Sequence, residues 1–412
     1  MKIPQGYKYT ELGIIPEDWE IKQISEFTDI ITGGTPNTSL PEYWGGDIKW
    51  MNSGELNLKF VKDVEGRITN EGLNNSSTHL IPTNCVLIGL AGQGKTRGTA
   101  AFTLIPLCTN QSIAAILPSN EHNSLYLYYV VDSLYEYLRL LSSGDGGRGG
   151  LNKNLLNSLQ IKMPKSIEEQ RRIAEVLSDV DGLIAALDKK ITKKKLIKQA
   201  TMQQLLTGKK RLQGFSEEWH SITLGEYATM SSGGTPLSSN PEYYDGDIPF
   251  LSISDITNAG KYINNTEKKI TELGLNNSSA KKFVKGTIMY AMYASLGKCA
   301  IANISLSCSQ AILGIIPDIN VINAEYLYYY MCFLEDTVKE LGQTGTQTNL
   351  SKQLVEQFRI SLPEDIIEQQ AIATILSDMD KEISDLERKR DKYKLLKNGI
   401  MQKLLTGQIR LK

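Results

Sequence analysis

The sequence lacks the features that mark several large classes of protein. Its 45 basic and 46 acidic residues leave a net charge of −1, so the chain as a whole offers no bulk attraction for nucleic acid. No apolar run approaches 18 residues, and the first residues do not resemble a signal peptide, so we expect no membrane contact and a cytoplasmic location. With 41% apolar and 22% charged residues over 412 positions, the composition predicts a folded, water-soluble chain of two or three domains.

Residues for metal and nucleophile chemistry are also scarce. The five cysteines contain no C-x-x-C pair, which favours reduced, mostly buried thiols over disulfides or a zinc site. Only three histidines are present, so imidazole-based metal or triad chemistry is poorly supplied. We therefore expect no metal and no catalytic residue in this chain.

An internal repeat determines the predicted architecture. The two halves match in order at a shift of about 200 residues. Gly-Gly-Thr-Pro occurs at 33–36 and 233–236, and Gly-Leu-Asn-Asn-Ser-Ser at 72–77 and 274–279. Two copies are too few and too long for a solenoid, so we expect a duplicated, pseudo-twofold protein.

Each copy divides into a head and a long helix. The first 160 or so residues combine turn residues with short apolar runs, which predicts a mixed α/β globule within an α+β fold class. One helix is expected in each head, over 126–141 and 326–341, capped by Asn123 and Asn323 and stopped by Gly144 and Gly342. Its tyrosines are expected to pack in the core.

The last 40 residues of each copy carry apolar residues at alternating three- and four-residue steps. A helix of that length is about 60 Å long, so its natural partner is the matching helix, packed as an antiparallel coiled coil that separates two similar heads. The predicted domains are 1–164 and 209–363 for the heads, and 165–208 and 364–412 for the helices. The seam residues proposed for this coiled coil and for partner docking are Ile173, Leu177, Val180, Ile184, Leu187, Ile372, Leu376, Met379, Ile383 and Leu386.

Local clusters supply candidates for binding a polyanion. Basic runs lie on both long helices, at 189–198 and 388–397, although a solvated helix surface explains such a run equally well. The polar loops at 143–150 and 342–349 could approach base edges. Gly94-Lys95 and Gly297-Lys298 are predicted to be equivalent turns near phosphate, and Thr35 and Thr235 follow the paired glycines. Each of these segments could instead be an ordinary surface turn. The DNA-binding candidates are Thr35, Lys95, Arg97, Arg148, Lys153, Thr235, Lys298, Gln343, Gln347, Asn349 and Lys352.

Three motifs that suggest an enzyme are weak in context. Residues 89–96 match the letters of a phosphate-binding P-loop, but a strand and not a helix is expected to follow. Asn240-Pro241-Glu242-Tyr243 approaches an adenine methyltransferase motif without its second proline, and reads as a turn. Glu20-Ile21-Lys22 has the letters of a nuclease motif among crowded acidic residues.

The paired motifs resemble a known family, the specificity subunits of type I restriction–modification enzymes. The resemblance covers nearly the whole chain and rests on duplicated segments in a fixed order. These are Gly13–Trp19 with Gly214–Trp219, the Glu-Gln-x-x-Ile-Ala-x-x-Leu-Ser-Asp-x-Asp segments that begin at Glu169 and Glu368, and Leu-Leu-Thr-Gly at 205–208 and 404–407.

The resemblance implies a non-catalytic subunit of a restriction system. Each head would be a target-recognition domain that reads one half of an asymmetric bipartite site in double-stranded DNA, and the helices would set the unread spacer. Two methyltransferase subunits would dock on the helices and restriction subunits can join them, so S-adenosylmethionine, ATP and Mg would belong to these partners. The competing hypotheses are a coiled-coil scaffold that does not read DNA and a nucleotide hydrolase dependent on Lys95.

Overall fold

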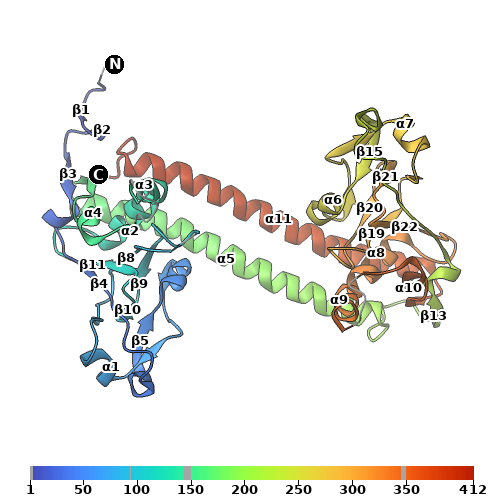
Figure 1. Cartoon of the computed structure of the whole chain (residues 1–412), viewed down its shortest axis with the longest axis horizontal. Coiled ribbons are helices and arrows are strands. Elements are labelled where there is room, and N and C mark those ends of the chain that lie inside the picture. Colours follow the sequence, from blue (N-terminus) through green and yellow to red (C-terminus); the bar gives the residue numbers. More distant parts are fainter. Residues whose placement is uncertain (1–2, 93, 143–149, 345–348) are drawn as a thin grey trace. The chain divides into compact units, whose positions relative to one another are not determined.

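The computed structural model describes residues 3–92, 94–142, 150–344 and 349–412 (Figure 1). The chain forms two compact units. Unit 1 comprises the chain up to Asp188 together with Arg388–Lys412, and unit 2 comprises Lys189–Glu387. Each unit therefore holds one head, the first part of one long helix and the last part of the other. This division cuts both long helices near their middles, while the boundaries expected from the sequence stay a prediction.

A five-stranded sheet forms the centre of the head in unit 1. Its order is β4-β11-β8-β9-β6, antiparallel except for the β6–β9 pair. The two strands β8 (Val86–Gly89) and β11 (Ile113–Ile116) are apolar throughout and wholly buried, as a sheet covered on both faces requires. The other three strands are β4 (Ile30–Thr32), β9 (Ala100–Thr103) and β6 (Phe60–Val61).

Smaller sheets and short helices complete unit 1. Strand β5 (Trp44–Met51) lies between β10 (Cys108–Thr109) and β7 (Arg67–Ile68), and β3 (Trp19–Gln23) pairs with β12 (Gln160–Pro164). The remaining elements are β1 (Tyr7–Thr10), β2 (Gly13–Pro16), α1 (Asn70–Asn74), α2 (Ser124–Ser133), α3 (Tyr135–Leu141) and α4 (Lys153–Asn157).

Unit 2 repeats this plan. Its five-stranded sheet has the order β14-β22-β19-β20-β16, a second sheet has the order β17-β15-β21-β18, and β13 pairs with β23. The strands are β13 (Trp219–Thr223), β14 (Ala228–Ser232), β15 (Tyr244–Leu251), β16 (Tyr262–Ile263), β17 (Lys268–Ile270), β18 (Lys282–Phe283), β19 (Ile288–Ala291), β20 (Cys299–Ala302), β21 (Leu306–Cys308), β22 (Ile312–Pro317) and β23 (Arg359–Pro363). The helices of its head are α6 (Ile253–Asn258), α7 (Glu272–Asn276), α8 (Ala324–Phe333), α9 (Glu335–Thr344) and α10 (Lys352–Glu356).

The helix expected in each head is present but broken. The predicted caps are confirmed, because the side chains of Asn123 and Asn323 accept bonds from the amides of Tyr126 and Tyr326 at 2.9 and 3.0 Å. The prediction of a single continuous helix in unit 1 is wrong, because Leu134 separates α2 from α3. The amide of Leu134 donates to the carbonyl of Val131, three residues back, and so makes a tighter turn than an α-helix does.

The expected helix end in unit 2 is also wrong, because α9 runs to Thr344, beyond Gly342. A single glycine weakens a helix by only about 1 kcal/mol and does not have to end it. The expectation for the tyrosines is confirmed. Tyr126, Tyr129 and their counterparts Tyr326 and Tyr329 are all buried in the two cores.

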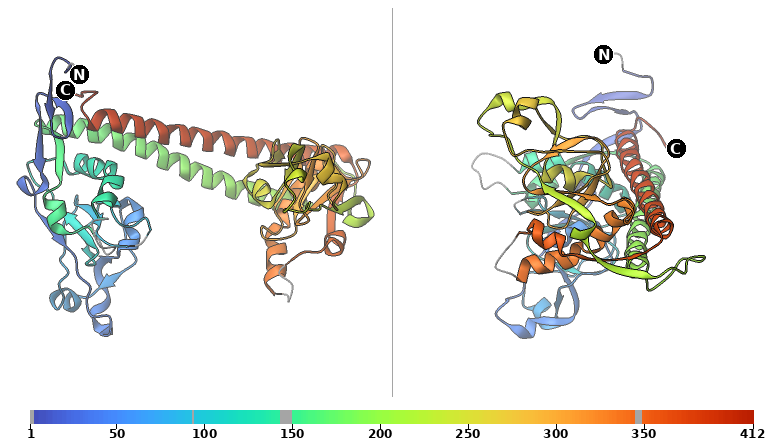
Figure 2. Two further views of the ribbon diagram at one scale, coloured as in Figure 1. Left: turned by 45° about the horizontal axis from the view of Figure 1, so that its top comes forward. Right: turned by 90° about the vertical axis from the view of Figure 1, so that its right-hand side faces the viewer.

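The two long helices are α5 (Ile167–Leu206) and α11 (Ile366–Leu405), each of 40 residues. Within each unit their segments run side by side (Figure 2). In unit 1 Asp181 of α5 pairs with Lys397 at 2.7 Å and Asp188 with Arg390 at 3.4 Å, so the two segments are antiparallel. In unit 2 three ion pairs show the same antiparallel order: Lys198–Asp380, Lys194–Glu382 and Lys195–Glu387.

The Glu-Gln pair at the start of each long helix anchors it to the head. The amide of Gln170 donates to the Pro164 carbonyl at 2.8 Å, and its carbonyl oxygen accepts from the Asn123 amide at 2.8 Å. Gln369 makes the matching contacts with Pro363 and Asn323 in unit 2. Because these bonds join the helix start to the last strand and to the cap of the head helix, they fix the direction in which the long helix leaves the head.

The glutamate of each pair binds an arginine from the tail that follows the other helix. In unit 1 Arg410 binds Glu169 at 2.7 and 2.8 Å and Asp18 at 2.7 and 2.8 Å. The hydrogen bond from Arg410 holds the pKa of Asp18 well below its ordinary value. In unit 2 Arg211 binds Glu368 at 2.9 and 2.7 Å. Both ends of the chain therefore meet in unit 1 around one buried carboxylate.

Candidate nucleic-acid interface

One edge of the five-stranded sheet in unit 1 gathers several of the candidate residues. Gly33 and Gly34 follow β4 and lie so close to Thr109 and Ser77 that a Cβ atom on either would be within 2.6 Å of backbone. This close packing holds the following Thr35, whose hydroxyl donates to the side-chain carbonyl of Gln111 at 2.5 Å. The glycines therefore have a structural reason, and they place Thr35 beside a polar partner that the sequence did not suggest.

The same edge receives two further loops. The amide of Leu90 donates to the Ser112 carbonyl at 2.8 Å, and the amide of Leu151 donates to the Leu90 carbonyl at 3.1 Å. The chain segments around 33–36, 90–99, 110–112 and 150–153 thus meet at one edge, which we call the recognition edge of unit 1. Lys95 and Lys153 lie on it and are exposed.

Unit 2 builds the same edge from 233–236, 292–298, 309–311 and 349–352. The hydroxyl of Thr235 donates to Gln310, the amide of Met292 to the Ala311 carbonyl at 2.9 Å, and the amide of Leu350 to the Met292 carbonyl at 3.0 Å. Asn349 is exposed on this edge. The two recognition edges therefore share a backbone arrangement and a threonine–glutamine hydrogen bond. They differ in other residues, because Leu90 and Ser112 of unit 1 stand where unit 2 has Met292 and Ala311.

The expected equivalence of Gly94-Lys95 with Gly297-Lys298 is wrong. Gly98 and Gly297 both have φ +80°, and each donates its amide to the last residue of the preceding central strand, at 2.9 and 3.2 Å. Gly297 therefore matches Gly98, and Lys298 matches Thr99. The turn of unit 1 is longer, and it carries Lys95 at a place that unit 2 lacks.

The lysines on the two edges differ in their partners. Among the residues that the structure describes, Lys95 and Lys153 have no acidic partner, whereas Lys298 pairs with Glu335 at 3.1 Å and Lys352 with Glu356 at 3.3 Å. Burial opposes the charge of Glu335, but hydrogen bonds from Lys339 and Lys298 hold its pKa below the ordinary value. Unit 1 thus offers its edge lysines to an anion more freely than unit 2.

The other candidates are less exposed or undescribed. Arg97 is half-buried and donates to the Ser142 hydroxyl at 3.2 Å, which ties it to the end of α3. Arg148 and Gln347 lie outside the described residues, and for Gln343 only the backbone within α9 is described.

Two of the three motifs that suggested an enzyme have structural explanations. Residue 89 ends one strand and β9 follows at Ala100, so the P-loop letters stand between two strands, as expected. Asn240 caps the short 3₁₀ turn Pro241–Tyr243 by accepting from the Glu242 amide at 3.1 Å, which confirms a turn. Within the described parts of the chain, no three His, Cys, Asp or Glu residues are grouped to hold a metal ion, and no helix is long and apolar enough to cross a membrane.

The exposed lysines on the second sheet of unit 2 were not among the DNA-binding candidates predicted from the sequence. They occupy its two edge strands and the turns beside them, and none has an acidic partner among the residues described. The Lys-Lys pairs in the sequence were the available signal. These residues are Lys268, Lys269, Lys281, Lys282 and Lys285.

The seam residues serve largely as core. Ile173 and Leu177 are fully buried in the unit 1 core, and Ile372 and Leu376 in that of unit 2; Leu187 and Ile383 are also buried, while Val180, Ile184, Met379 and Leu386 are half-buried. Several lysines and one arginine of the basic runs are neutralised by acidic residues on the facing helix. The long helices also carry exposed apolar side chains, among them Val176, Leu183, Leu196, Ile197, Leu395 and Leu396.

Comparison with known proteins gives a consistent result. The family model described as "Type I restriction modification DNA specificity domain" matches residues 16–197 and 216–395. The type I restriction enzyme MjaIX specificity subunit of Methanocaldococcus jannaschii is 25% identical, with 98% of this chain and 96% of the relative covered. The EcoR124I/EcoR124II specificity subunit of Escherichia coli is 30% identical over 40% of this chain and 41% of the relative. A specificity subunit structure from Mycoplasma genitalium superimposes with a TM-score of 0.61 at 18% identity, covering 98% of both chains, and so shares the fold.

Proposed function

Because this chain belongs to the type I restriction–modification DNA specificity family, we propose that it is the DNA-reading subunit of such a complex. Each head reads one half of a bipartite site, and the chain itself carries out no catalytic step. The observation that carries the proposal is the pair of recognition edges, in which one backbone arrangement presents different residues at matching places, Leu90 against Met292 and Ser112 against Ala311. Lys95 lies on the edge of unit 1 alone. Two readers with different side chains require an asymmetric site.

The charge distribution supports contact with DNA at both heads by different means. In unit 1 the unpaired Lys95 and Lys153 lie on the recognition edge itself and suit phosphate contacts. In unit 2 the edge lysines are paired, and the lysines of its second sheet supply the positive charge instead. The net charge of −1 means that affinity depends on these local groups and on partner subunits.

The exposed apolar residues of the long helices support docking of methyltransferase subunits. Leu395 of unit 1 is 73% exposed, and Leu196 of unit 2 is 61% exposed. Isolated exposed leucines are common, but several on the long-helix segments of one unit favour an interface, and unit 1 carries Val176, Leu183, Leu395 and Leu396. The partners would bring S-adenosylmethionine, ATP and Mg.

The function is tested by co-expression with the methyltransferase encoded beside this chain, followed by long-read mapping of N6-methyladenine. We expect methylation at one split, asymmetric motif. Exchanging the head segment 20–160 for that of a relative should change one half of the motif, and exchanging the matching segment of unit 2 should change the other half. Absence of methylation from a soluble complex would favour the scaffold hypothesis instead.

Docking is tested separately by replacing exposed leucines. Leu183→Glu with Leu395→Glu should prevent co-purification of the methyltransferase, because a charge at an apolar contact loses its hydration. Lys190→Glu, an exposed change on the same helix, is the matched control and should leave co-purification intact. Equal recovery of the partner with both variants would place the docking surface elsewhere.

A further inference from the structure

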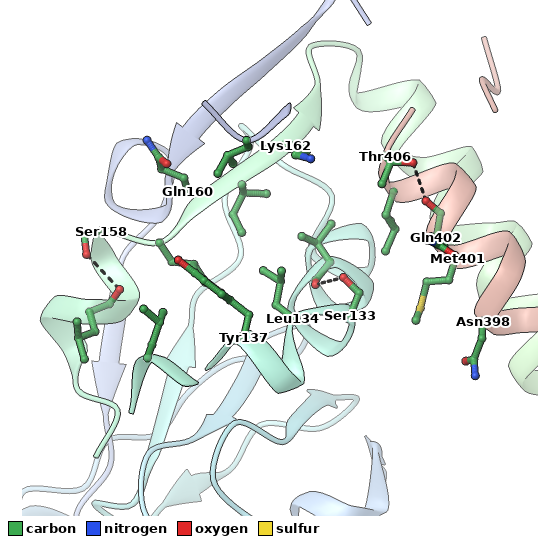
Figure 3. A pocket seen from close by; sticks show the side chains of 17 residues that line it. Ser133, Leu134, Tyr137, Ser158, Gln160, Lys162, Asn398, Met401, Gln402 and Thr406 are labelled. Atoms are coloured by element: carbon green, nitrogen blue, oxygen red, sulfur yellow. Dashed lines mark hydrogen bonds between the residues drawn. The ribbon is translucent and has the colours of Figure 1, made fainter. Parts of the chain in front are cut away.

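Unit 1 contains a cavity whose lining residues lie outside the segments of its recognition edge. It has a volume of about 560 Å³ and lies between α2, α3, α4, β12 and the last turns of α11 (Figure 3). Its walls are mainly apolar and include Val130, Leu134, Leu159 and Met401. Figure 3 shows Lys162 on β12 at one side and Gln402 on α11 at another. Sites for small ligands have volumes of about 300–1,000 Å³ and combine apolar walls with a few polar groups.

The duplicated unit shows what fits into this space. Tyr126 donates its hydroxyl to the Lys162 carbonyl at 3.0 Å, and Tyr326 donates to the Ser361 carbonyl at 2.7 Å, which fixes the match between the two units. By this match three small or aliphatic cavity residues of unit 1 correspond to aromatic residues of unit 2. The pairs are Val130 with Tyr330, Ser133 with Phe333, and Leu159 with Phe358.

Those aromatic side chains belong to the core of unit 2. Tyr330 is buried, Phe333 and Phe358 pack against the same cluster, and the rings of Tyr330 and Phe333 meet edge to face with centroids 5.9 Å apart. The same framework therefore accommodates aromatic rings at the positions where unit 1 has open space. In unit 2, aromatic side chains thus occupy the matching positions.

The cavity also differs from its counterpart in charge. Lys162 is half-buried beside the apolar walls, and it has no acidic partner among the described residues. Burial lowers its pKa, because the charged ammonium loses hydration without gaining a counter-ion. Unit 2 has the uncharged Ser361 at this position. The lysine thus occurs in the unit with the open cavity and not in the unit whose space is filled.

We propose that this cavity binds a small aromatic carboxylate, with the ring in the space that Tyr330 and Phe333 fill in unit 2 and the carboxylate on Lys162. A carboxylate would give the lysine the partner that it lacks, through a charge-assisted hydrogen bond. The site is distinct from the recognition edge of unit 1, since none of its lining residues belongs to the segments 33–36, 90–99, 110–112 and 150–153.

The experiment is calorimetric titration of the purified full-length chain, without DNA or methyltransferase, with 2-naphthoate as the probe. We expect saturable binding of one probe per chain, and at least tenfold weaker binding of the neutral analogue 2-naphthalenemethanol. Val130→Tyr with Ser133→Phe, which introduces the residues of unit 2, should abolish binding. Lys162→Ser should weaken binding of the carboxylate about tenfold and leave binding of the alcohol unchanged. Lys22→Ser, on the neighbouring strand, is the matched control.

Three results would overturn the proposal. These are no saturable binding at millimolar probe, equal binding of the acid and the alcohol, and unchanged binding by the filled variant. The cavity would instead belong to a protein partner if two results occur together. The unaltered chain would not bind the probe, and the variant with Val130→Tyr and Ser133→Phe would still read DNA but no longer retain the methyltransferase. If the double variant does not fold, the single variants Leu159→Phe and Lys162→Ser are titrated with the probe instead, and unchanged binding by both would overturn the proposal.

Discussion

Removing the arginine that binds the buried glutamate of each unit should destabilise that unit and leave the other unchanged. Glu169 is 3% exposed and Glu368 is fully buried, and their carboxylates bind Arg410 and Arg211, respectively. Leaving a buried carboxylate without its partner costs about 3–5 kcal/mol. Arg410→Met should therefore destabilise unit 1 by that amount, and Arg211→Met should destabilise unit 2.

Hydrogen exchange measured by mass spectrometry separates the two effects, because each unit serves as the control for the other. A loss of 3 kcal/mol corresponds to roughly 100-fold faster exchange of amides that open with the unit. Arg410→Met should accelerate exchange across β3 and β12, with no change in β13 and β23, and Arg211→Met should do the reverse. Adding Glu169→Met to Arg410→Met should recover most of the loss, since an apolar pair leaves no buried charge.

Two results would contradict this prediction: a change in exchange of less than tenfold in unit 1 of Arg410→Met, or an equal response of both units. The first result would mean that water reaches Glu169 and replaces the arginine. The second would mean that the units open together. Lys412→Met is the matched control, because Lys412 binds Asp18 at 3.1 Å but is 67% exposed, and such surface pairs contribute about 0–1 kcal/mol.

Three further predictions follow from single positions. Gly34→Ala should lower the free energy of unfolding in urea by about 1–3 kcal/mol, because its Cβ would lie 2.6 Å from backbone. Gly182→Ala, in open space on α5, should raise it by up to about 1 kcal/mol, and equal effects of the two changes would contradict the close approach at Gly34. Burial lowers the pKa of His122 from 6.5 to about 4, so its contribution to stability is present above pH 6.5 and is lost as the pH falls towards 4, by up to about 1.4 kcal/mol for each pH unit. His122→Gln should flatten this dependence of the unfolding free energy on pH in urea titrations, and an unchanged dependence would refute the prediction. In DNA binding by the assembled complex, Lys95→Gln should reduce the slope of log affinity against log salt concentration by about 0.9. Lys298→Gln should reduce this slope by clearly less, because Lys298 is already ion-paired, and the opposite order would argue against the charge difference between the two recognition edges.

The long helices and the duplication were predictable because both are written as periodic or repeated letters. The apolar steps through Ile173 and Leu177 identify a helix whatever its surroundings, and the helices have the expected length of about 40 residues. The caps at Asn123 and Asn323 were equally local, since the capping side chain bonds to amides two or three residues ahead.

What was missed depends on contacts between distant parts of the chain. Glu169 and Arg410 are 241 residues apart, and nothing local marks them as partners. The equivalence of the two turns was misread because Gly-Lys occurs in both, while the residue that fixes the backbone is the left-handed glycine at 98 and 297. Only the hydrogen bonds to the preceding strand distinguish these alternatives.

The duplication also separates what the fold requires from what can vary. Both units keep a tyrosine bound to the last aspartate of the repeated motif, Tyr129 to Asp181 at 2.9 Å and Tyr329 to Asp380 at 2.8 Å, and a lysine from the facing helix joins each aspartate. The glutamate-arginine closure is kept as well. The recognition edges and the cavity differ, although they stand on the same elements. Because these differences leave the shared framework intact, each head can change its side chains without changing how the long helices are held, which is what independent reading of two half-sites requires.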